Sequence, residues 1–301
     1  MKNKKIMIIF LFVITIFLTS CEFDYDGINY TCDENGTNCS ITRTNSSADL
    51  GTFTPGKWVF HKAADLKEFY DNPMPFGEYV PEDAQYSNVK LPLIIWLHGG
   101  IGSNENCSDK SDATSLEKHR FIKVISNWEK TGLKPISAVI MAPSHCDTVG
   151  WSGTKSKKTV RAIIDYAVKY RNVDRNRVIL MGHSDGGTGV VQVSRSNQDL
   201  FAGIVVLSGF ACFGPDYDYY KTIPLKGYMT GNPARAADPN GGGDGNTGME
   251  RCFREVNKSS ELHIFPKDVT HDEVQEKAFT LDEDNDGVSD LINWATLQYK
   301  N

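Results

Sequence analysis

Ser184 stands at a position from which a serine side chain performs nucleophilic chemistry. It lies in "RVILMGHSDGGTG", Arg177 to Gly189, where an apolar run is followed by Gly-His-Ser-Asp-Gly and then by small residues that open a helix. Gly182 and Gly186 permit a sharp turn between a strand and a helix, which lifts the serine side chain clear of the backbone. The alternative is a serine in an ordinary glycine-rich loop. A nucleophilic serine also requires a base, an acid and donors for an oxyanion.

His271 is the histidine that we expect to act as the base. It lies in "FPKDVTHDEV", a short loop between an apolar run and a helical pattern. It is the last of the seven histidines and follows Ser184, as the chain order of nucleophile, acid and histidine requires. The alternative is a surface histidine. His98 precedes the serine, and we therefore interpret it as a structural histidine that supports its own loop.

Backbone N–H groups after "LIIWL" are the expected donors of an oxyanion hole. The run ends in "HGG", His98 to Gly100, and small residues at this point let N–H groups turn toward a developing negative charge. We expect the hole to combine the N–H of Gly100 or Ile101 with that of Asp185, the residue after the nucleophile.

The stretch "DEDNDGVSD" has the spacing of oxygen ligands in the first part of a calcium loop. Such a loop takes ligands at positions one, three, five and nine, with glycine at six. The corresponding ligands here are Asp282, Asp284, Asp286 and Asp290. Position twelve, which calls for Glu, is Asn293. The alternative is an acidic turn that caps the following helix. The sequence indicates no cofactor for catalysis, and any calcium would be structural.

Six short apolar runs rich in Val, Ile and Leu end in Gly or Pro, which is typical of strands buried on both faces. They lie at 90–100, 136–145, 177–184, 202–209, 225–231 and 261–266. Helical patterns lie at 158–170, 248–256 and 290–299, and an edge strand is expected within 74–85. Strands that alternate with helices predict an α/β fold with a mostly parallel sheet covered on both faces. Catalytic groups then collect at the carboxyl ends of the strands.

The N-terminus has the pattern of a bacterial lipoprotein leader. A basic start is followed by an apolar run over residues 6–18 and then by "LTSC", which ends at Cys21. We expect a signal peptide over 1–20, a lipidated Cys21, a flexible tether over 21–54 and one catalytic domain over 55–301. The protein would then be anchored by acyl chains to a membrane of the cell envelope, facing the periplasm or the exterior. The alternative is an ordinary signal peptide with a chance cysteine.

The charge and the cysteine content of the chain indicate which partners and which covalent bridges to expect. The net charge is -6 and no long basic cluster occurs, so we expect no nucleic-acid partner. Six cysteines remain after Cys21, an even number that favours disulfides in an exported protein, although fifteen pairings are allowed. Cys32 and Cys39 flank a polar turn and are candidates for a local bridge. The sequence does not determine the oligomeric state.

In these motifs the chain resembles α/β-hydrolase esterases, a group with carbohydrate esterases, feruloyl esterases, polyhydroxybutyrate depolymerases and predicted lipoprotein peptidases. The matching pieces are "YVPEDAQYSNVKLPLIIWLHGGIGSNE", "VIMAPSH", "VDRNRVILMGHSDGG" and "THDEV…DLINWA", in the family order over most of 74–297. The resemblance implies an α/β-hydrolase fold with a sheet of about eight strands. It also implies an acyl-enzyme intermediate that is hydrolysed by water.

The resemblance also directs attention to an acid and an aromatic residue. Relatives place an Asp shortly after a Gly at the end of the penultimate strand, but no acid directly follows Gly231. Asp238, which precedes a proline, and Asp244 are both candidates, and each is alternatively a turn aspartate. Asp216 and Asp218 are outside candidates. Trp151 corresponds to an aromatic that lines the substrate pocket in such enzymes, and a core tryptophan is the alternative.

The expected function is hydrolysis of an acyl ester, on a small molecule or a polysaccharide outside the cytoplasm. A serine peptidase would use the same triad, and only the pocket would distinguish it. A surface binding lipoprotein without activity is the third alternative, because a fold does not fix a function.

Overall fold

The structure is a computed structural model that describes 53–82, 89–100, 113–145, 150–209, 217–231, 260–300 and three residues between 253 and 256. It also describes the backbone of three strands near the N-terminus. The chain divides into two compact units, Met1–Gly51 and Thr52–Asn301.

The first unit holds a small antiparallel sheet of three strands. These are β1 (Glu22–Tyr25), β2 (Ile28–Cys32) and β3 (Cys39–Arg43), in the order β1-β2-β3. The sequence led us to expect a flexible tether over 21–54, and the structure places these three strands within it. The sequence has a physical reason for them, because Asp-Gly between β1 and β2 is a strong hairpin signal. Cys32 and Cys39 are direct cross-strand partners in the backbone register.

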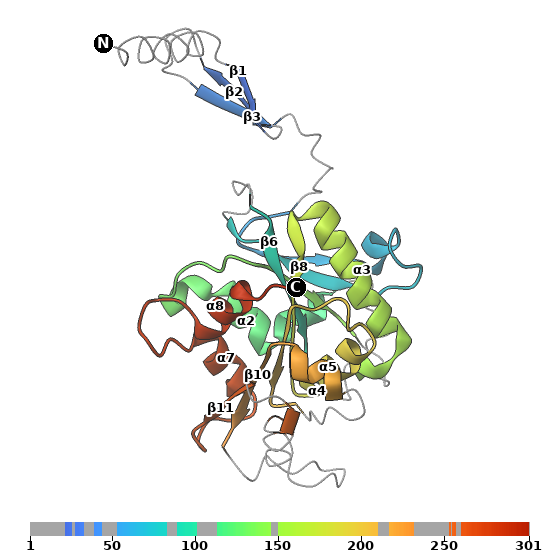
Figure 1. Ribbon diagram of the computed structural model, residues 1–301, viewed down its shortest axis with the longest axis vertical. Helices are drawn as coiled ribbons and strands as arrows, with labels where there is room; N and C mark the ends of the chain where they lie inside the picture. The colour runs from blue at the N-terminus through green and yellow to red at the C-terminus, as the bar shows by residue number, and fades with distance from the viewer. Residues whose placement is uncertain are drawn as a thin grey trace, which may run out of the picture. The chain divides into compact units, whose positions relative to one another are not determined.

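The second unit is built on a sheet of eight strands in the order β11-β10-β9-β8-β6-β7-β5-β4. Figure 1 labels β6, β8, β10 and β11 of this sheet. Its strands are β4 (Trp58–His61), β5 (Phe76–Tyr79), β6 (Leu91–Leu97), β7 (Val139–Pro143), β8 (Val173–His183), β9 (Gly203–Leu207), β10 (Leu225–Thr230) and β11 (Glu261–Phe265). The β4–β5 and β5–β7 pairs are antiparallel, and all other neighbours are parallel. The carboxyl ends of β6, β8, β9, β10 and β11 therefore meet at one edge.

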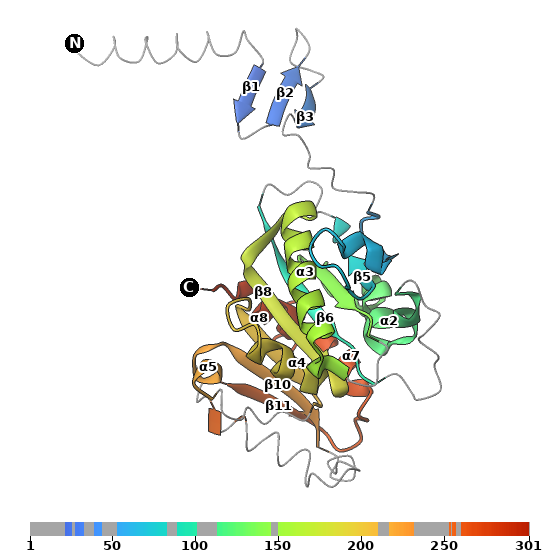
Figure 2. The same cartoon turned by 90° about the vertical axis from the view of Figure 1, so that its right-hand side faces the viewer.

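Helices cover both faces of the sheet (Figures 1 and 2). They are α2 (Arg120–Ser126), α3 (Thr154–Tyr170), α4 (Asp185–Arg195), α5 (Tyr217–Thr222), α7 (Glu273–Thr280) and α8 (Asp290–Leu297). Short 3₁₀ turns lie at η1 (Ala63–Leu66), η4 (Thr114–Lys118), η5 (Trp128–Thr131) and η6 (Gly150–Ser152). In the described part of the chain, no helix is both long and apolar enough to span a membrane.

Two hydrophobic cores result, one on each face of the sheet. Strand β6 shows the division, because Leu93, Ile95 and Leu97 join the core under α3, α4 and α5. Ile94 and Trp96 join the core under α2, α7 and α8. All seven residues of β6 are buried, as expected for a central parallel strand.

Each of the six apolar runs forms a strand. The stretch 74–85 also supplies a strand, β5, but β5 pairs with β7 on one side and β4 on the other, so the edge strand is β4 and not the expected one. Strand β4 was not predicted. Its four residues are all half-buried, so they show no alternation of apolar and polar positions. Helix α3 starts four residues before the apolar period that predicted it, because its first turn is polar.

Candidate active site

Ser184 occupies a strained turn between β8 and α4. Its backbone has φ 58° and ψ −119°, a combination that non-glycine residues rarely adopt. The Ser184 N–H donates to the carbonyl of Leu207 on β9 at 2.9 Å, and the Ser184 carbonyl accepts from Thr188 N at 3.0 Å. The neighbouring strand and the first turn of the helix thus hold the strained residue in place. Strain of this kind costs about 1–3 kcal/mol and is typical of functional sites.

The turn is closed by glycines that leave no room for a side chain. A methyl group on Gly182 would lie 2.3 Å from the carbonyl oxygen of Gly186. A methyl group on Gly186 would lie 2.0 Å from the carbonyl oxygen of Leu97 at the end of β6. The two glycines flanking Ser184 therefore let helix α4 approach both strands closely.

The "HGG" segment passes directly beside the serine. A Cβ on Gly99 would lie 3.3 Å from Ser184 Cβ, whereas a Cβ on Gly100 would meet nothing within 4 Å. Gly99, Gly100 and Ser184 line one cavity of about 460 Å³, within the usual range for small-ligand sites. Asp185 begins helix α4, so its N–H belongs to the positive helix terminus. Gly100 lines the cavity beside Ser184, Asp185 directly follows the serine, and Ile101 lies outside the described residues.

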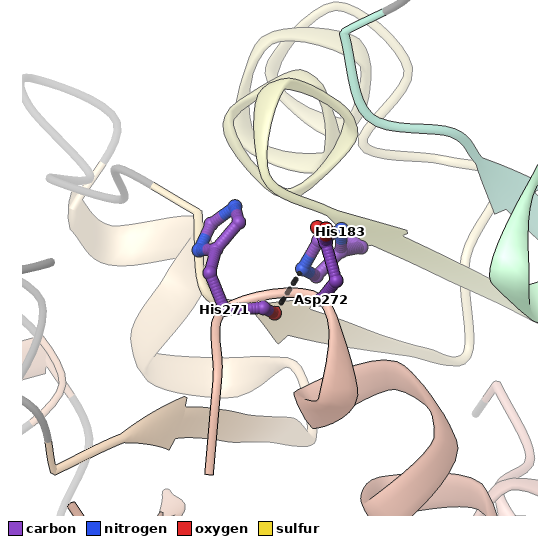
Figure 3. Close-up of side chains that lie close together, drawn as sticks. All are labelled: His183, His271 and Asp272. Atoms are coloured by element: carbon purple, nitrogen blue, oxygen red, sulfur yellow. Dashed lines mark hydrogen bonds between the residues drawn. The ribbon is translucent and has the colours of Figure 1, made fainter. Parts of the chain in front are cut away.

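His271 lies beside the serine turn through a contact with His183. His183 Nε2 donates to the carbonyl oxygen of His271 at 2.8 Å, and the two rings are 4.6 Å apart (Figure 3). Since His183 directly precedes Ser184, this bond connects the loop of His271 to β8, the strand that leads into Ser184.

His183 donates this bond as a neutral imidazole, so the contact adds no charge beside His271. Burial lowers the pKa of His183 to about 3, and the neighbouring His271 contributes to the decrease. A proton accepted by His271 during a reaction would therefore have no second imidazolium beside it.

His98 supports its own loop, as expected. Its Nδ1 donates to the carbonyl of Gly99 at 2.7 Å, and its Nε2 accepts from the backbone N–H of His145 at 3.2 Å. Both bonds are satisfied by one neutral tautomer. Burial, followed by the nearby His119 and His145, holds the pKa of His98 well below its usual range.

Trp151 does not line this cavity, which corrects the expectation of a pocket residue. It is buried, donates through Nε1 to the carbonyl of His98 at 3.1 Å and packs against Gly189 of α4. Its indole supports the segment that carries Gly99 and Gly100, so it is a core tryptophan with a positioning contact.

The candidate acids lie mainly outside the described residues. Three of them lie in segments that the structure does not describe: Asp216, Asp238 and Asp244. The same holds for five cysteines: Cys21, Cys107, Cys146, Cys212 and Cys252. Asp218 is described. Its side chain on α5 is 98% exposed and pairs with Lys221, so it does not contact His271. Asp238 and Asp244 remain the candidates.

Four charged residues that the sequence did not single out line the serine cavity. Lys118, Arg120 and Lys123 come from η4 and α2, and Asp272 follows His271. The run "EKHRFIK" is visibly basic, but its helical period alone does not indicate which face meets the site.

Among the described residues, two clusters have the composition of metal ligands. Ligand atoms of His183, His271 and Asp272 lie within 4.8 Å of one another, as do those of Asp282, Asp284 and Asp286. In the first cluster, His183 Nε2 already serves as a hydrogen-bond donor. Asp290 is not part of the second cluster. Its Oδ2 accepts from Glu283 N at 3.1 Å, which departs from the expected ligand role.

The comparisons with known proteins agree with the fold. No family model and no curated protein matches the sequence. Solved structures do match. A thermostable esterase has TM-score 0.53 and 16% identity, with 75% of this chain and 60% of that chain covered. This chain therefore spans less than two thirds of that esterase.

Two further structures match over nearly their whole length. The fluorophosphonate-binding serine hydrolase FphF of Staphylococcus aureus has TM-score 0.55 and 14% identity, covering 81% of this chain and 99% of that chain. A ferulic acid esterase has TM-score 0.54 and 13% identity, covering 80% and 97%. With the strand order and the serine turn between β8 and α4, these matches establish that this chain has the α/β-hydrolase fold.

Proposed function

We propose that the protein is a serine hydrolase that cleaves a carboxylic ester through an acyl-enzyme intermediate. The observation that carries the proposal is the strained backbone of Ser184 between two glycines that cannot bear a side chain. Such strain is maintained when it presents a nucleophile. The neighbours named as esterases and as a serine hydrolase support the same chemistry.

In the proposed reaction, His271 removes the Ser184 hydroxyl proton as Oγ attacks the ester carbonyl. The N–H groups of Asp185 and of Gly100 or Ile101 stabilise the resulting oxyanion. His271 then gives the proton to the leaving alcohol as the C–O bond breaks. Water, deprotonated by His271, attacks the acyl carbonyl; the bond to Ser184 Oγ breaks, Oγ takes the proton back from His271, and the carboxylic acid leaves. Asp238 or Asp244 orients the imidazole and stabilises its charged form.

The experiment is turnover of p-nitrophenyl acyl esters and methyl ferulate by the full chain in mild detergent, compared with Ser184→Ala, Asp238→Asn and Asp244→Asn. Turnover that is lost in Ser184→Ala supports an esterase. The Asp variant whose turnover is strongly reduced identifies the acid. Labelling by a fluorophosphonate probe without ester turnover would favour a peptidase. The absence of both would favour a binding protein without activity.

We further propose a lipid-anchored protein of the bacterial cell envelope whose substrate is a small-molecule or polysaccharide ester outside the cytoplasm. The pattern "LTSC" ending at Cys21 supports the anchor. Metabolic labelling with a fatty acid in the native host tests it. Wild type should incorporate the label, and Cys21→Ser should not. Equal labelling of both would contradict lipidation.

For the acidic loop we propose a structural calcium ion held by Asp282, Asp284 and Asp286. The close approach of their carboxylates supports oxygen ligation of a hard cation. Added Ca²⁺ should raise Tm above that in EGTA, and Asp284→Asn should reduce the increase. An unchanged Tm, or an equal response in the variant, would contradict calcium in this loop. Mg²⁺ serves as the control.

A further inference from the structure

The cavity beside Ser184 is lined by an excess of positive charge. Lys118, Arg120 and Lys123 contribute three cationic side chains, and Asp272 is the one carboxylate among the described lining residues. The chain as a whole has net charge -6. Cations thus gather at the nucleophile of an otherwise acidic protein, which is the pattern expected where an anion must approach.

The arrangement of the cations follows from helix geometry. Arg120 and Lys123 are three residues apart at the start of α2, so they share one face of the helix. Lys118 ends η4, two residues before α2 begins. All three line the same cavity as Gly99, Gly100 and Ser184, so three cationic side chains share the cavity with the serine.

Arg120 is held by a contact outside this cavity. Its Nε lies 3.2 Å from Glu276 Oε2 on α7. The pair is half-exposed and uses Nε, so the terminal nitrogens keep further N–H donors in a fork that suits a carboxylate or another oxyanion. Lys123 lies one turn further along α2 and adds a more flexible cation.

We infer that the ester substrate carries an anionic group, such as a carboxylate, near the scissile carbonyl, and that Arg120 and Lys123 bind it. The inference rests on the proposed ester hydrolysis and specifies its substrate class. Cations near an open cavity act mainly through encounter and ground-state binding, and salt screens that attraction. The preference should therefore appear in kcat/KM and weaken as ionic strength rises.

Two matched pairs of esters test the inference on the full chain in mild detergent. The first compares p-nitrophenyl butyrate with mono-p-nitrophenyl glutarate, which carries a carboxylate on the acyl side. The second compares benzyl acetate with 4-(acetoxymethyl)benzoate, which carries a carboxylate on the alcohol side. In at least one pair, we expect about a tenfold higher kcat/KM for the anionic ester at low salt. Each exposed cation attracts the carboxylate only weakly, and the contributions of Arg120 and Lys123 add.

Variants assign this preference to the cavity. Lys123→Gln and Arg120→Gln should each lower the anionic-to-neutral ratio of kcat/KM about threefold, and Lys123→Glu should lower it further. Lys130→Gln is the matched control, since Lys130 lines a neighbouring surface hollow and not the serine cavity. It should keep the wild-type ratio. A thermal melt of each variant verifies folding.

The outcomes separate the inference from the proposed function. Equal kcat/KM within both pairs, or a preference that survives Lys123→Gln and Arg120→Gln, overturns the anionic substrate and leaves an esterase. Labelling of Ser184 by a fluorophosphonate without turnover of either anionic ester also overturns it. No turnover and no labelling overturn the esterase itself, and the inference with it.

Discussion

At the scale of single residues, two glycines near Ser184 differ in how much room they leave for a side chain. A methyl group on Gly186 would lie 2.0 Å from the backbone carbonyl oxygen of Leu97, whereas one on Gly100 would have none of the described residues within 4 Å. Gly186→Ala should therefore lower the free energy of unfolding by about 3 kcal/mol or more. Gly100→Ala should leave it within about 1 kcal/mol. Urea unfolding of both variants measures this, and equal losses would contradict the tight turn.

The sequence indicated which residues could form this site, but not the environment in which each side chain lies. Ser184, His98 and the glycines could be interpreted because they follow strong apolar runs. Trp151 could not be assigned, because the sequence does not say whether an indole faces the core or a cavity. The role of Asp238 or Asp244 rests on a glycine-rich stretch without hydrophobic periodicity, and such a stretch fixes no position.

At the scale of elements, a buried ion pair connects the edge of the sheet to α3. Glu78 on β5 is fully buried, accepts from Arg171 Nη2 at 2.9 Å and contacts His61 Nε2 on β4 at 2.9 Å. Burial raises the pKa of Glu78, but hydrogen bonds from His61 and Arg171 outweigh it and hold the pKa below its usual value. The pair thus fixes β4, which the apolar pattern alone did not predict.

Removing one partner should leave a buried, uncompensated charge. Arg171→Ala is expected to lower the free energy of unfolding by about 3–5 kcal/mol. Arg161, whose half-exposed side chain lies 3.0 Å from Asp199, is the control. Arg161→Ala should cost about 1 kcal/mol or less. Chemical denaturation of the two variants makes the comparison, and similar losses would contradict a structural role for the buried pair.

The central strands were predictable for a physical reason. Strands covered on both faces must be continuously apolar, so β6 to β11 appear in the sequence as runs of Val, Ile and Leu. The role of helix α2, by contrast, could not be predicted from the sequence. Phe121 and Ile122 on its apolar side are buried in the core. Arg120 and Lys123 line the serine cavity only because the fold brings α2 to that cavity.

At the scale of the whole molecule, buried neutral histidines make stability depend on pH. The pKa of His183 falls from 6.5 to about 3 on folding, because burial disfavours the charged ring. Between these values the unfolded chain binds a proton that the folded chain does not, so stability falls as pH decreases through 6.5 toward 3. At pH 5, His183 alone should remove about 2 kcal/mol.

Urea unfolding at pH 7.5, 6 and 5 measures this loss. His183→Gln keeps an amide donor for the His271 carbonyl but cannot titrate, so its stability should fall less steeply with pH. The buried His98 should maintain part of the slope. An identical slope in the variant and wild type would show that His183 is not the group responsible.

The central claim is that Ser184 is an activated nucleophile, and covalent labelling tests it most directly. The full chain is treated with a fluorophosphonate probe and digested, and the modified peptide is identified by mass spectrometry. The account predicts one modification at Ser184, absent in Ser184→Ala and strongly slowed in His271→Ala. No modification of folded wild-type protein, or labelling unaffected by either substitution, would contradict it.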